Sequence, residues 1–343
     1  MKDKTIAVDI AKDVFEIAVS DKPGKVSQRK RVTRSRFLHF FTTIEPGTVL
    51  MEACGSSHFW SREIQKLGHT VILLPPHLVR PYRRGNKHDR ADAKAILEAH
   101  RNEEIQPVPI KSIEQQILAS IHRLRSAWRD TRTARINTIR GLLREIGIFI
   151  PKGASQVVPR VQGLVEDAES GLPDALRSYL YEACLEILDL ERRMKEAENQ
   201  LDALAKQSPA TQRLLTIPGI GLLTATALVG FIGDLKRFRS GRHFASYLGL
   251  VPKEHSSGNV RRRGRITKRG DVYIRMLLTH GARAVLNAAK RKEQPDRLRS
   301  WALKIETTRG HNKATIALAN KLARIAWAVS TQETQFQSMA TAA

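Results

Sequence analysis

Short apolar runs separated by polar turns mark the first hundred residues. Residues 5–9, 14–19 and 26–32 predict a meander of three strands, and residues 48–51 and 70–74 predict two more. Helical patterns at residues 37–41 and 57–67 separate the later strands. Strands that first form a meander and then alternate with helices predict a mixed α/β sheet covered by helices on its faces. Pro107 and Pro109 end this segment, because proline removes a backbone donor and disfavours helix in the residue before it.

Helical periodicity dominates the rest of the chain. Residues 113–148 and 172–204 predict two long helices, joined by a turn within the Gly-, Pro- and Val-rich interval 151–163. They form either an antiparallel hairpin or half of an intermolecular coiled coil. Further helices are predicted at residues 222–232, 273–290 and 313–329. The chain thus divides into an α/β domain at residues 1–110, a helical segment at 111–207, a mainly helical domain at 208–330 and a tail at 331–343.

The charge of the chain indicates which class of partner it binds. The 343 residues include 58 Lys and Arg against 34 Asp and Glu, which gives a net charge of +24 and a pI near 10.5. A polyanion must offset such an excess, so nucleic acid is the leading partner. No apolar run approaches the roughly 20 residues that span a bilayer, and the first residues lack a signal-peptide pattern. With only Cys54 and Cys184, far apart, neither a disulfide framework nor a zinc site is indicated, and we expect a cytoplasmic protein.

Four acids stand where one metal site can form. Asp9 and Glu52 end apolar strands, and Asp89 and Asp92 lie three residues apart on a predicted helix, so they share one helix face. Four such carboxylates can hold two Mg²⁺ ions, or Mn²⁺, about 4 Å apart and clamp a phosphodiester. Taken singly, each acid is more simply a surface residue or a helix-terminal acid.

Basic and glycine-rich positions suggest where nucleic acid binds. They are the loop residues Arg83, Arg84 and Lys87 beside the acids; Gly219 and Gly221 before a predicted helix, as in helix-hairpin-helix modules; and the run Arg261, Arg262, Arg263, Arg265, Lys268 and Arg269. Between residues 253 and 275, eight Lys and Arg stand against two acids. Seven arginines between residues 123 and 144 are a further candidate track for nucleic acid. For the loop the alternative is a solvated surface, and for the run at residues 261–269 it is a solvated basic surface or a nucleic-acid backbone track without catalysis.

Several blocks of the sequence resemble one family. Residues 7–12 (AVDIAK), 51–55 (MEACG) and 87–93 (KHDRADA) look like the three acidic blocks of the DEDD transposases, the Piv-type site-specific recombinases of the IS110 insertion-sequence family. Residues 217–221 (IPGIG), 246–252 (SYLGLVP), 256–258 (SSG) and 266–271 (ITKRGD) look like its C-terminal transposase domain. The blocks occur in the family's order along nearly the whole chain.

The resemblance implies an N-terminal RuvC-like domain of RNase H fold, a coiled-coil dimerisation segment and a mainly helical C-terminal domain. It assigns metal binding and catalysis to Asp9, Glu52, Asp89 and Asp92, and a covalent nucleophile to Ser257, with Ser256 as the alternative. It also implies a structured guide RNA encoded by the element, which pairs with target and donor double-stranded DNA. Recombination of two duplexes suggests a homodimer that forms a tetramer, as a dimer of dimers, in the prokaryotic cytosol.

The leading hypothesis is therefore a magnesium-dependent, RNA-guided DNA recombinase that acts through a serine–DNA intermediate. Two other hypotheses remain open at this point. One is a RuvC-type structure-selective nuclease that uses metal-activated water. The other is a nucleic-acid-binding protein without catalysis, in which Ser256 and Ser257 belong to a polar turn.

Overall fold

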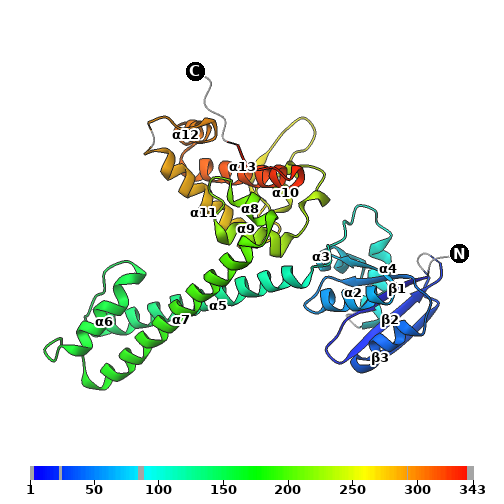
Figure 1. The fold of residues 1–343 in the computed structure, drawn as a ribbon, viewed down its shortest axis with the longest axis horizontal. Coiled ribbons are helices and arrows are strands. Elements are labelled where there is room, and N and C mark those ends of the chain that lie inside the picture. Colours follow the sequence, from blue (N-terminus) through cyan, green and yellow to red (C-terminus); the bar gives the residue numbers. More distant parts are fainter. Residues whose placement is uncertain (1–3, 23–24, 84–88, 292, 338–343) are drawn as a thin grey trace. The chain divides into compact units, whose positions relative to one another are not determined.

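The chain folds into two compact units, Met1–Ser112 and Ile113–Ala343 (Figure 1). The computed structural model describes residues 4–22, 25–83, 89–291 and 293–337. Within these ranges no helix is both long and apolar enough to cross a membrane.

The first unit is built on a five-stranded mixed sheet, which confirms the predicted α/β architecture. Its strands are β1 (Thr5–Asp9), β2 (Val14–Ser20), β3 (Gln28–Thr33), β4 (Thr48–Glu52) and β5 (Thr70–Leu74). They lie in the order β3-β2-β1-β4-β5. β1, β2 and β3 pair antiparallel as a meander, whereas β1 pairs parallel with β4, and β4 with β5. The central strand β1 therefore has one antiparallel and one parallel neighbour.

Helices cover both faces of this sheet because successive strand residues point to opposite sides. In β1, Ile6 and Val8 pack with α1 (Phe37–Thr42) and α2 (Ser57–Lys66), where large aromatic side chains fill the core. Ala7, between them, faces α3 (Pro76–Val79) and α4 (Asp89–His100). Ala18 of β2 and three alanines of α4 belong to this second core. Such small side chains let α4 lie close to the central strands.

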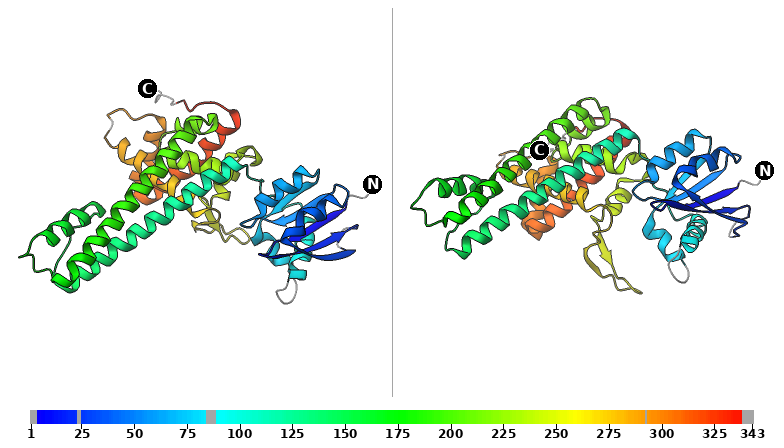
Figure 2. Two further views of the ribbon diagram at one scale, coloured as in Figure 1. Left: turned by 60° about the horizontal axis from the view of Figure 1, so that its bottom comes forward. Right: turned by 90° about the horizontal axis from the view of Figure 1, so that it is seen from below.

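Two long helices open the second unit, α5 (Ile113–Glu145) and α7 (Asp174–Lys206), and they pack side by side as an antiparallel pair (Figure 2). The predicted turn at residues 151–163 is wrong in part, because α6 (Val157–Glu166) occupies much of it. Val157, Val161 and Leu164 of α6 join the apolar core at the far end of the pair. An amphipathic helix thus forms in a Gly- and Pro-containing interval because the long helices leave an apolar end to cover.

Arginines of α5 bind acids of α7 across the helix pair. Arg125 Nη2 lies 2.6 Å from Glu198 Oε1 and Arg132 Nε lies 2.8 Å from Glu191 Oε1, and Arg135 is paired with Glu186. Arg140 donates instead to the backbone oxygens of residues 151 and 153, at 2.6 and 2.8 Å. These four arginines therefore join parts of the same chain, which gives them a structural role, and the predicted nucleic-acid track along α5 stays a prediction.

The rest of the second unit is mainly helical, as predicted. Its elements are α8 (Pro209–Leu215), α9 (Leu222–Ala227), a π-helical segment (Leu228–Ile232), α10 (Gly241–Tyr247), β6 (Pro252–Glu254), β7 (Arg263–Ile266), α11 (Val272–Ala289), α12 (Arg297–Arg309) and α13 (His311–Gln332). One apolar core joins α8, α9, α10, α11 and α13 with the first half of α12. The strands β6 and β7 form an antiparallel hairpin that extends from this core (Figure 2).

A buried histidine fastens α5 to the C-terminal helices. His122, 1% exposed, lies 2.9 Å from Thr226 Oγ1 through Nε2 and 3.0 Å from the Tyr273 hydroxyl through Nδ1. Thr226 already donates to the Leu222 carbonyl at 2.6 Å, so it accepts from Nε2–H, and Nδ1 accepts from Tyr273. The network therefore requires a neutral imidazole. Burial, and then the charge of Arg125, lower the pKa of His122 from 6.5 to about 4.

We predict that acid destabilises the second unit through His122. The folded-state pKa of His122 lies below its unfolded value. The contribution of His122 to the free energy of unfolding is therefore fully present above about pH 6.5 and is lost as the pH falls toward 4. The full shift corresponds to about 3 kcal/mol. Calorimetric unfolding of the wild type and His122→Gln between pH 7 and 4.5 measures this change in the free energy of unfolding. The variant should be less stable at pH 7 but lose less stability on acidification. Equal pH dependence in both proteins would contradict the assignment.

Candidate active site

Three of the four predicted acids line one cavity of the first unit. The cavity has a volume of about 340 Å³ and is lined by Asp9, Glu52, Pro76, Val79, Arg80, Arg83, Asp92 and Ala95. The acids come from β1, β4 and α4, which are far apart in sequence. The structure thus brings together Asp9, Glu52 and Asp92.

Strand geometry explains how Asp9 and Glu52 meet. β1 and β4 are parallel neighbours, with Val8 opposite Met51, so their last residues lie at the same edge of the sheet. Two-residue alternation places Asp9 on the face of Ala7 and Glu52 on the face of Leu50. Ala7 and Leu50 both pack toward α3 and α4. Both carboxylates therefore face the helix that carries Asp92.

Asp92 reaches the same space from the buried stripe of α4. Ala95, Ile96 and Ala99 are buried, and positions three, four and seven residues apart share one helix face. Arg83 binds Asp92, with 3.2 Å between Nη1 and Oδ1, and the two side chains are only 24% and 18% exposed. This half-buried ion pair neutralises one acid of the cavity. Arg80 brings a second guanidinium to its wall.

The remaining predictions for this region concern residues 84–90. Asp89 is the first residue of α4, one helical turn before Asp92, but its side chain lies outside the described part of the structure. Arg84 and Lys87 lie outside the described residues altogether. Their roles stay predictions.

Sequence reasoning missed a buried acid beside the cavity. Glu16 of β2 is 4% exposed and stands directly opposite Asp9 in the antiparallel register. Directly opposed residues have Cβ atoms about 5 Å apart, so two carboxylates here repel each other unless cations lie near. Arg31 of β3 supplies one, with 3.7 Å between Nε and Glu16 Oε2. The available signal was a single acid inside the apolar run of residues 14–19.

The donor atoms of this cavity suit a hard divalent cation. Mg²⁺ binds carboxylate oxygens, and Asp9, Glu52 and Asp92 present them from three elements around one space. Among the residues that the structure describes, no three Asp, Glu, His or Cys side chains are already grouped as a complete metal site. Asp92 is instead held by Arg83. The residues present fit a cation in type and placement, although Arg83 already binds Oδ1 of Asp92.

Ser257, the predicted nucleophile, belongs to the second unit, at the tip of the β6–β7 hairpin. Its backbone pairs with Val260 in both directions, at 3.1 and 3.2 Å, around Gly258 with a φ of +55°. Ser257 is exposed, and its hydroxyl has no hydrogen-bond partner in the described part of the chain. The structure thus places the acids together in the first unit and the serine in the second.

Ser256 differs from Ser257 in its contacts. Its hydroxyl donates to Glu254 Oε1 at 2.9 Å and accepts from the Arg262 backbone N–H at 3.2 Å. The Ser256 hydroxyl, and then Arg261, lower the pKa of Glu254. A carboxylate whose pKa is lowered is a weaker base. Ser256 therefore stabilises the hairpin, whereas the structure gives the Ser257 hydroxyl no such contact within the described residues.

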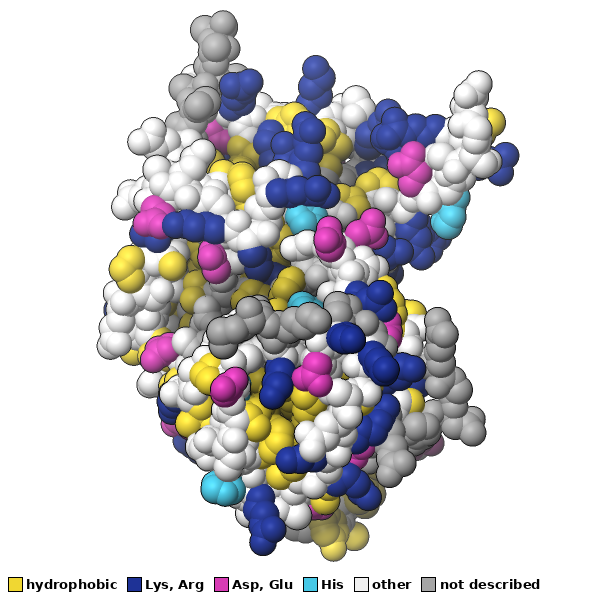
Figure 3. All heavy atoms as spheres, turned by 90° about the vertical axis from the view of Figure 1, so that its right-hand side faces the viewer, with side chains coloured by type: hydrophobic (Ala, Val, Ile, Leu, Met, Phe, Trp, Pro, Cys, Tyr) yellow, Lys and Arg dark blue, Asp and Glu magenta, His cyan; other side chains and the backbone are white. Residues whose placement is uncertain are grey.

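Cations crowd this hairpin. All six predicted nucleic-acid contacts in it, Arg261, Arg262, Arg263, Arg265, Lys268 and Arg269, are exposed. Arg261 pairs with Glu254 at 3.0 Å. Figure 3, which colours side chains by type, likewise shows more Lys and Arg than Asp and Glu on the drawn sides of the units. The cations of the hairpin can bind phosphates without contacting the bases.

The two predicted phosphate-contacting glycines differ in their surroundings. Gly219 has a φ of +82°, and a Cβ there would lie 2.7 Å from Val285 Cγ2 and 2.8 Å from the Gly281 carbonyl oxygen. Gly221 is exposed at the start of α9, with nothing within 4 Å of a built Cβ. Gly219 thus serves packing against α11, and only Gly221 borders open space.

Two family models match the sequence, one over most of the first unit and α5, and one within the second unit. A DEDD-type transposase model of the IS110 kind matches residues 6–148, and a model described as "Transposase IS116/IS110/IS902 family" matches residues 211–297. The chain belongs to the IS110 family of transposases. Members of this family are enzymes that cleave and recombine DNA.

Relatives of this transposase align over almost its full length. It is 41% identical to a probable family 20 transposase of Pseudomonas aeruginosa, over 97% of this chain and 98% of the relative. It is 38% identical to the transposase for insertion sequence element IS1111A of Coxiella burnetii, over 98% and 92%. The transposase for IS1328 of Yersinia enterocolitica is also 38% identical, over 96% and 98%.

We predict that the two glycines of the transposase respond differently to alanine. Gly219→Ala should destabilise the second unit by about 1–3 kcal/mol, because the left-handed backbone and the contact with α11 both resist a Cβ. Gly221→Ala should change stability by about 0.5 kcal/mol or less. Thermal unfolding of the two variants measures this difference. A fully stable Gly219→Ala protein would contradict the packing role.

Proposed function

We propose that this transposase excises and integrates its own insertion sequence by metal-dependent DNA cleavage and strand exchange through a covalent serine–DNA intermediate. The observation that supports it most directly is the meeting of Asp9, Glu52 and Asp92 in one cavity with two arginines. The strand order β3-β2-β1-β4-β5, with acids at the ends of β1 and β4, supports an RNase H fold of the RuvC type.

Asp9, Glu52, Asp89 and Asp92 would hold two Mg²⁺ ions, or Mn²⁺, and Arg80 and Arg83 would hold DNA phosphates beside them. When bound, the metals would stabilise charge on the attacking and leaving oxygens of the phosphodiester. Arg83 can serve twice, because a guanidinium that binds the Asp92 carboxylate also suits a phosphate. A phosphate that draws Arg83 away frees Asp92 for metal binding.

Ser257 would attack the scissile phosphorus with its hydroxyl oxygen. The Ser257 Oγ–P bond forms, the bond from phosphorus to the leaving deoxyribose oxygen breaks, and the serine proton is transferred to that oxygen through solvent. The new phosphodiester conserves the bond energy, so a different DNA end can reverse the step and rejoin. The exposure of Ser257 at the hairpin tip supports access by DNA, and the arginines around it can offset charge at the phosphate.

Double-stranded target and donor DNA are the proposed polyanionic partners, together with a structured guide RNA encoded by the element. The net charge of +24 and the exposed cations of the β6–β7 hairpin support a polyanion of either kind. The α8–α9 connection, with Gly221 exposed, is proposed to contact phosphates as a helix-hairpin-helix-like element. The complex would act in the prokaryotic cytosol, at the nucleoid.

The helix pair α5–α7 is the proposed coiled-coil dimerisation segment, at residues 111–207, followed by the transposase domain at 208–330. Leu124 of α5 is 53% exposed, and Leu185 and Leu188 of α7 are 39% and 41% exposed. Exposed apolar side chains along long helices are typical of a seam that a second helix pair covers. We propose a homodimer, and a dimer of dimers when two duplexes recombine.

We predict that Asp9→Asn and Asp92→Asn each reduce Mg²⁺-dependent cleavage of duplex DNA carrying the element's ends by about two orders of magnitude or more, because each removes a charged ligand. Glu98→Gln is the matched control, since Glu98 lies on α4 outside the cavity and pairs with Arg101. Cleavage is measured on denaturing gels, with DNA binding measured in parallel. Wild-type cleavage by both Asn variants would contradict the catalytic role of these acids, whereas DNA binding without cleavage by the wild type would favour a non-catalytic binding protein.

We predict that Ser257→Ala abolishes the covalent protein–DNA adduct, because it removes the attacking oxygen, whereas Ser256→Ala retains it. A radiolabelled DNA strand that migrates with the protein on a denaturing gel reports the adduct. Adduct lost only in Ser256→Ala would move the nucleophile to Ser256. Cleavage by the wild type without any adduct would instead identify a RuvC-type nuclease that uses water.

A further inference from the structure

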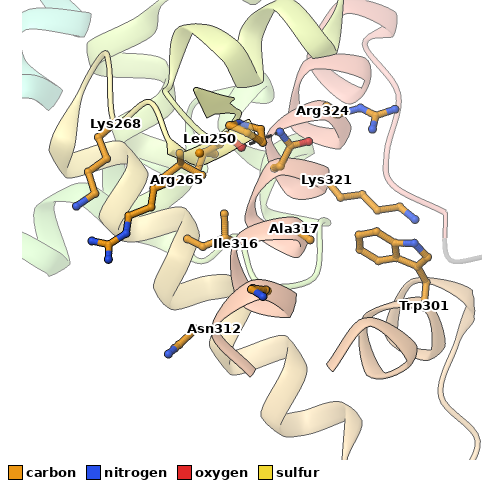
Figure 4. Close-up of a pocket in the computed structure, with 14 residues that line it drawn as sticks. Leu250, Arg265, Lys268, Trp301, Asn312, Ile316, Ala317, Lys321 and Arg324 are labelled. Atoms are coloured by element: carbon orange, nitrogen blue, oxygen red, sulfur yellow. Dashed lines mark hydrogen bonds between the residues drawn. The ribbon is translucent and has the colours of Figure 1, made fainter. Parts of the chain in front are cut away.

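A cavity of about 1090 Å³ in the second unit is not used by this chemistry (Figure 4). It lies between the base of the β6–β7 hairpin, α12 and α13. Its walls are formed by Leu250, Pro252, Gly264, Arg265, Ile266, Lys268, Trp301, Asn312, Lys313, Ile316, Ala317, Asn320, Lys321 and Arg324. A space of this size admits a group larger than a single phosphate.

The wall combines positive charge with apolar surface. Its charged members are all cations, Arg265, Lys268, Lys313, Lys321 and Arg324, and no acid is among the described residues that line it. The other side chains are mostly aliphatic, apart from Trp301 and two asparagines. An occupant that complements this wall has negative charge and a flat or apolar body together.

Trp301 and Lys321 are in contact at one side of the cavity. Lys321 Nζ lies 4.0 Å from the centre of the indole ring, and Figure 4 shows the two side chains together at one side. Burial, and then the charges of Arg324 and Arg297, lower the pKa of Lys321. The lysine thus lies over an aromatic face and close to other cations, so a bound anion would stabilise its charged form.

We propose that this cavity receives an unpaired nucleotide of a bound nucleic-acid strand, with its base against Trp301 and the aliphatic wall and its phosphates among the lysines and arginines. Aromatic stacking combined with a cationic groove is the usual means of binding single strands. A base inside a duplex is stacked on both faces, so it has no free face that can stack on the indole. A phosphate gives Lys321 its counterion, and the base takes the indole face that Lys321 covers.

This inference rests on the proposed function, since it assigns a single-stranded segment to a protein that handles nucleic acid. Its position favours such a role, because Arg265 and Ile266 line the cavity and also belong to β7 of the serine hairpin. A strand whose nucleotide lies in the cavity is thus held at the base of the hairpin that carries Ser257.

The test measures binding by the full chain to oligothymidine, oligouridine and a DNA duplex of equal length at one fixed salt concentration. Trp301→Ala should weaken single-strand binding by about 10- to 100-fold and leave duplex binding within about twofold. Trp301→Phe keeps an aromatic face and should retain most of the affinity. The two single strands show whether DNA, RNA or both occupy the cavity.

A second variant guards against a folding defect, since Trp301 also packs against the core. Lys321→Gln should weaken single-strand binding by several fold, whereas Lys304→Gln, an exposed lysine of α12 outside the cavity, should not. Unchanged single-strand binding in Trp301→Ala and Lys321→Gln would overturn the inference. Equal losses of affinity for single strand and duplex in these variants would also overturn it. A wild type that binds duplex alone would overturn the inference too, but it would leave the proposed function intact. A wild type that binds neither defeats both.

Discussion

The first unit depends on the parallel pairing of β1 with β4, which brings carboxylates to one edge of the sheet. Asp9 and Glu52 point to the same face through strand alternation, and α4 adds Asp92. Glu16 stands opposite Asp9 on the neighbouring strand. Like charges this close, in a partly buried cavity, cost free energy unless cations pair them. Arg83 pairs with Asp92 and Arg31 with Glu16, which supplies part of that compensation. In the proposed function, divalent metals are the matched counter-ions for the acids and DNA phosphates for the arginines.

Positive charge in the second unit falls into two classes. Along α5, Arg125, Arg132 and Arg135 pair with acids of α7, so their charge joins two helices of one chain. Around the β6–β7 hairpin and the neighbouring cavity, cations greatly outnumber acids. Paired charges orient helices, whereas uncompensated charges attract polyanions. In the described residues, positive charge without an acidic partner is therefore concentrated more around the hairpin and the cavity than between α5 and α7, which supports the proposal that polyanions bind there.

The two units carry complementary parts of the proposed chemistry. The acids of the first offer places for metal and phosphate, and the second offers an exposed hydroxyl on a cationic hairpin. Ser256, tied to Glu254 and to the Arg262 backbone, keeps the hairpin in shape, so the neighbouring Ser257 can remain exposed without the turn losing its form. The contacts thus distinguish two neighbouring serines that the sequence alone leaves equivalent, and they support the proposal that Ser257 is the nucleophile.

By itself, the sequence determined the strands of the sheet, the long helices and the positions of the acids, because local alternation and periodicity report on burial. It also supplied the family, through short blocks in a fixed order. Only the tertiary structure decided which charges are compensated. The ion pairs of α5 with α7, the partner of Asp92, the place of Glu16 beside Asp9 and the cavity next to Trp301 all join residues distant in sequence. The helix α6 also depends on such contacts, since its apolar face is covered only when α5 and α7 meet.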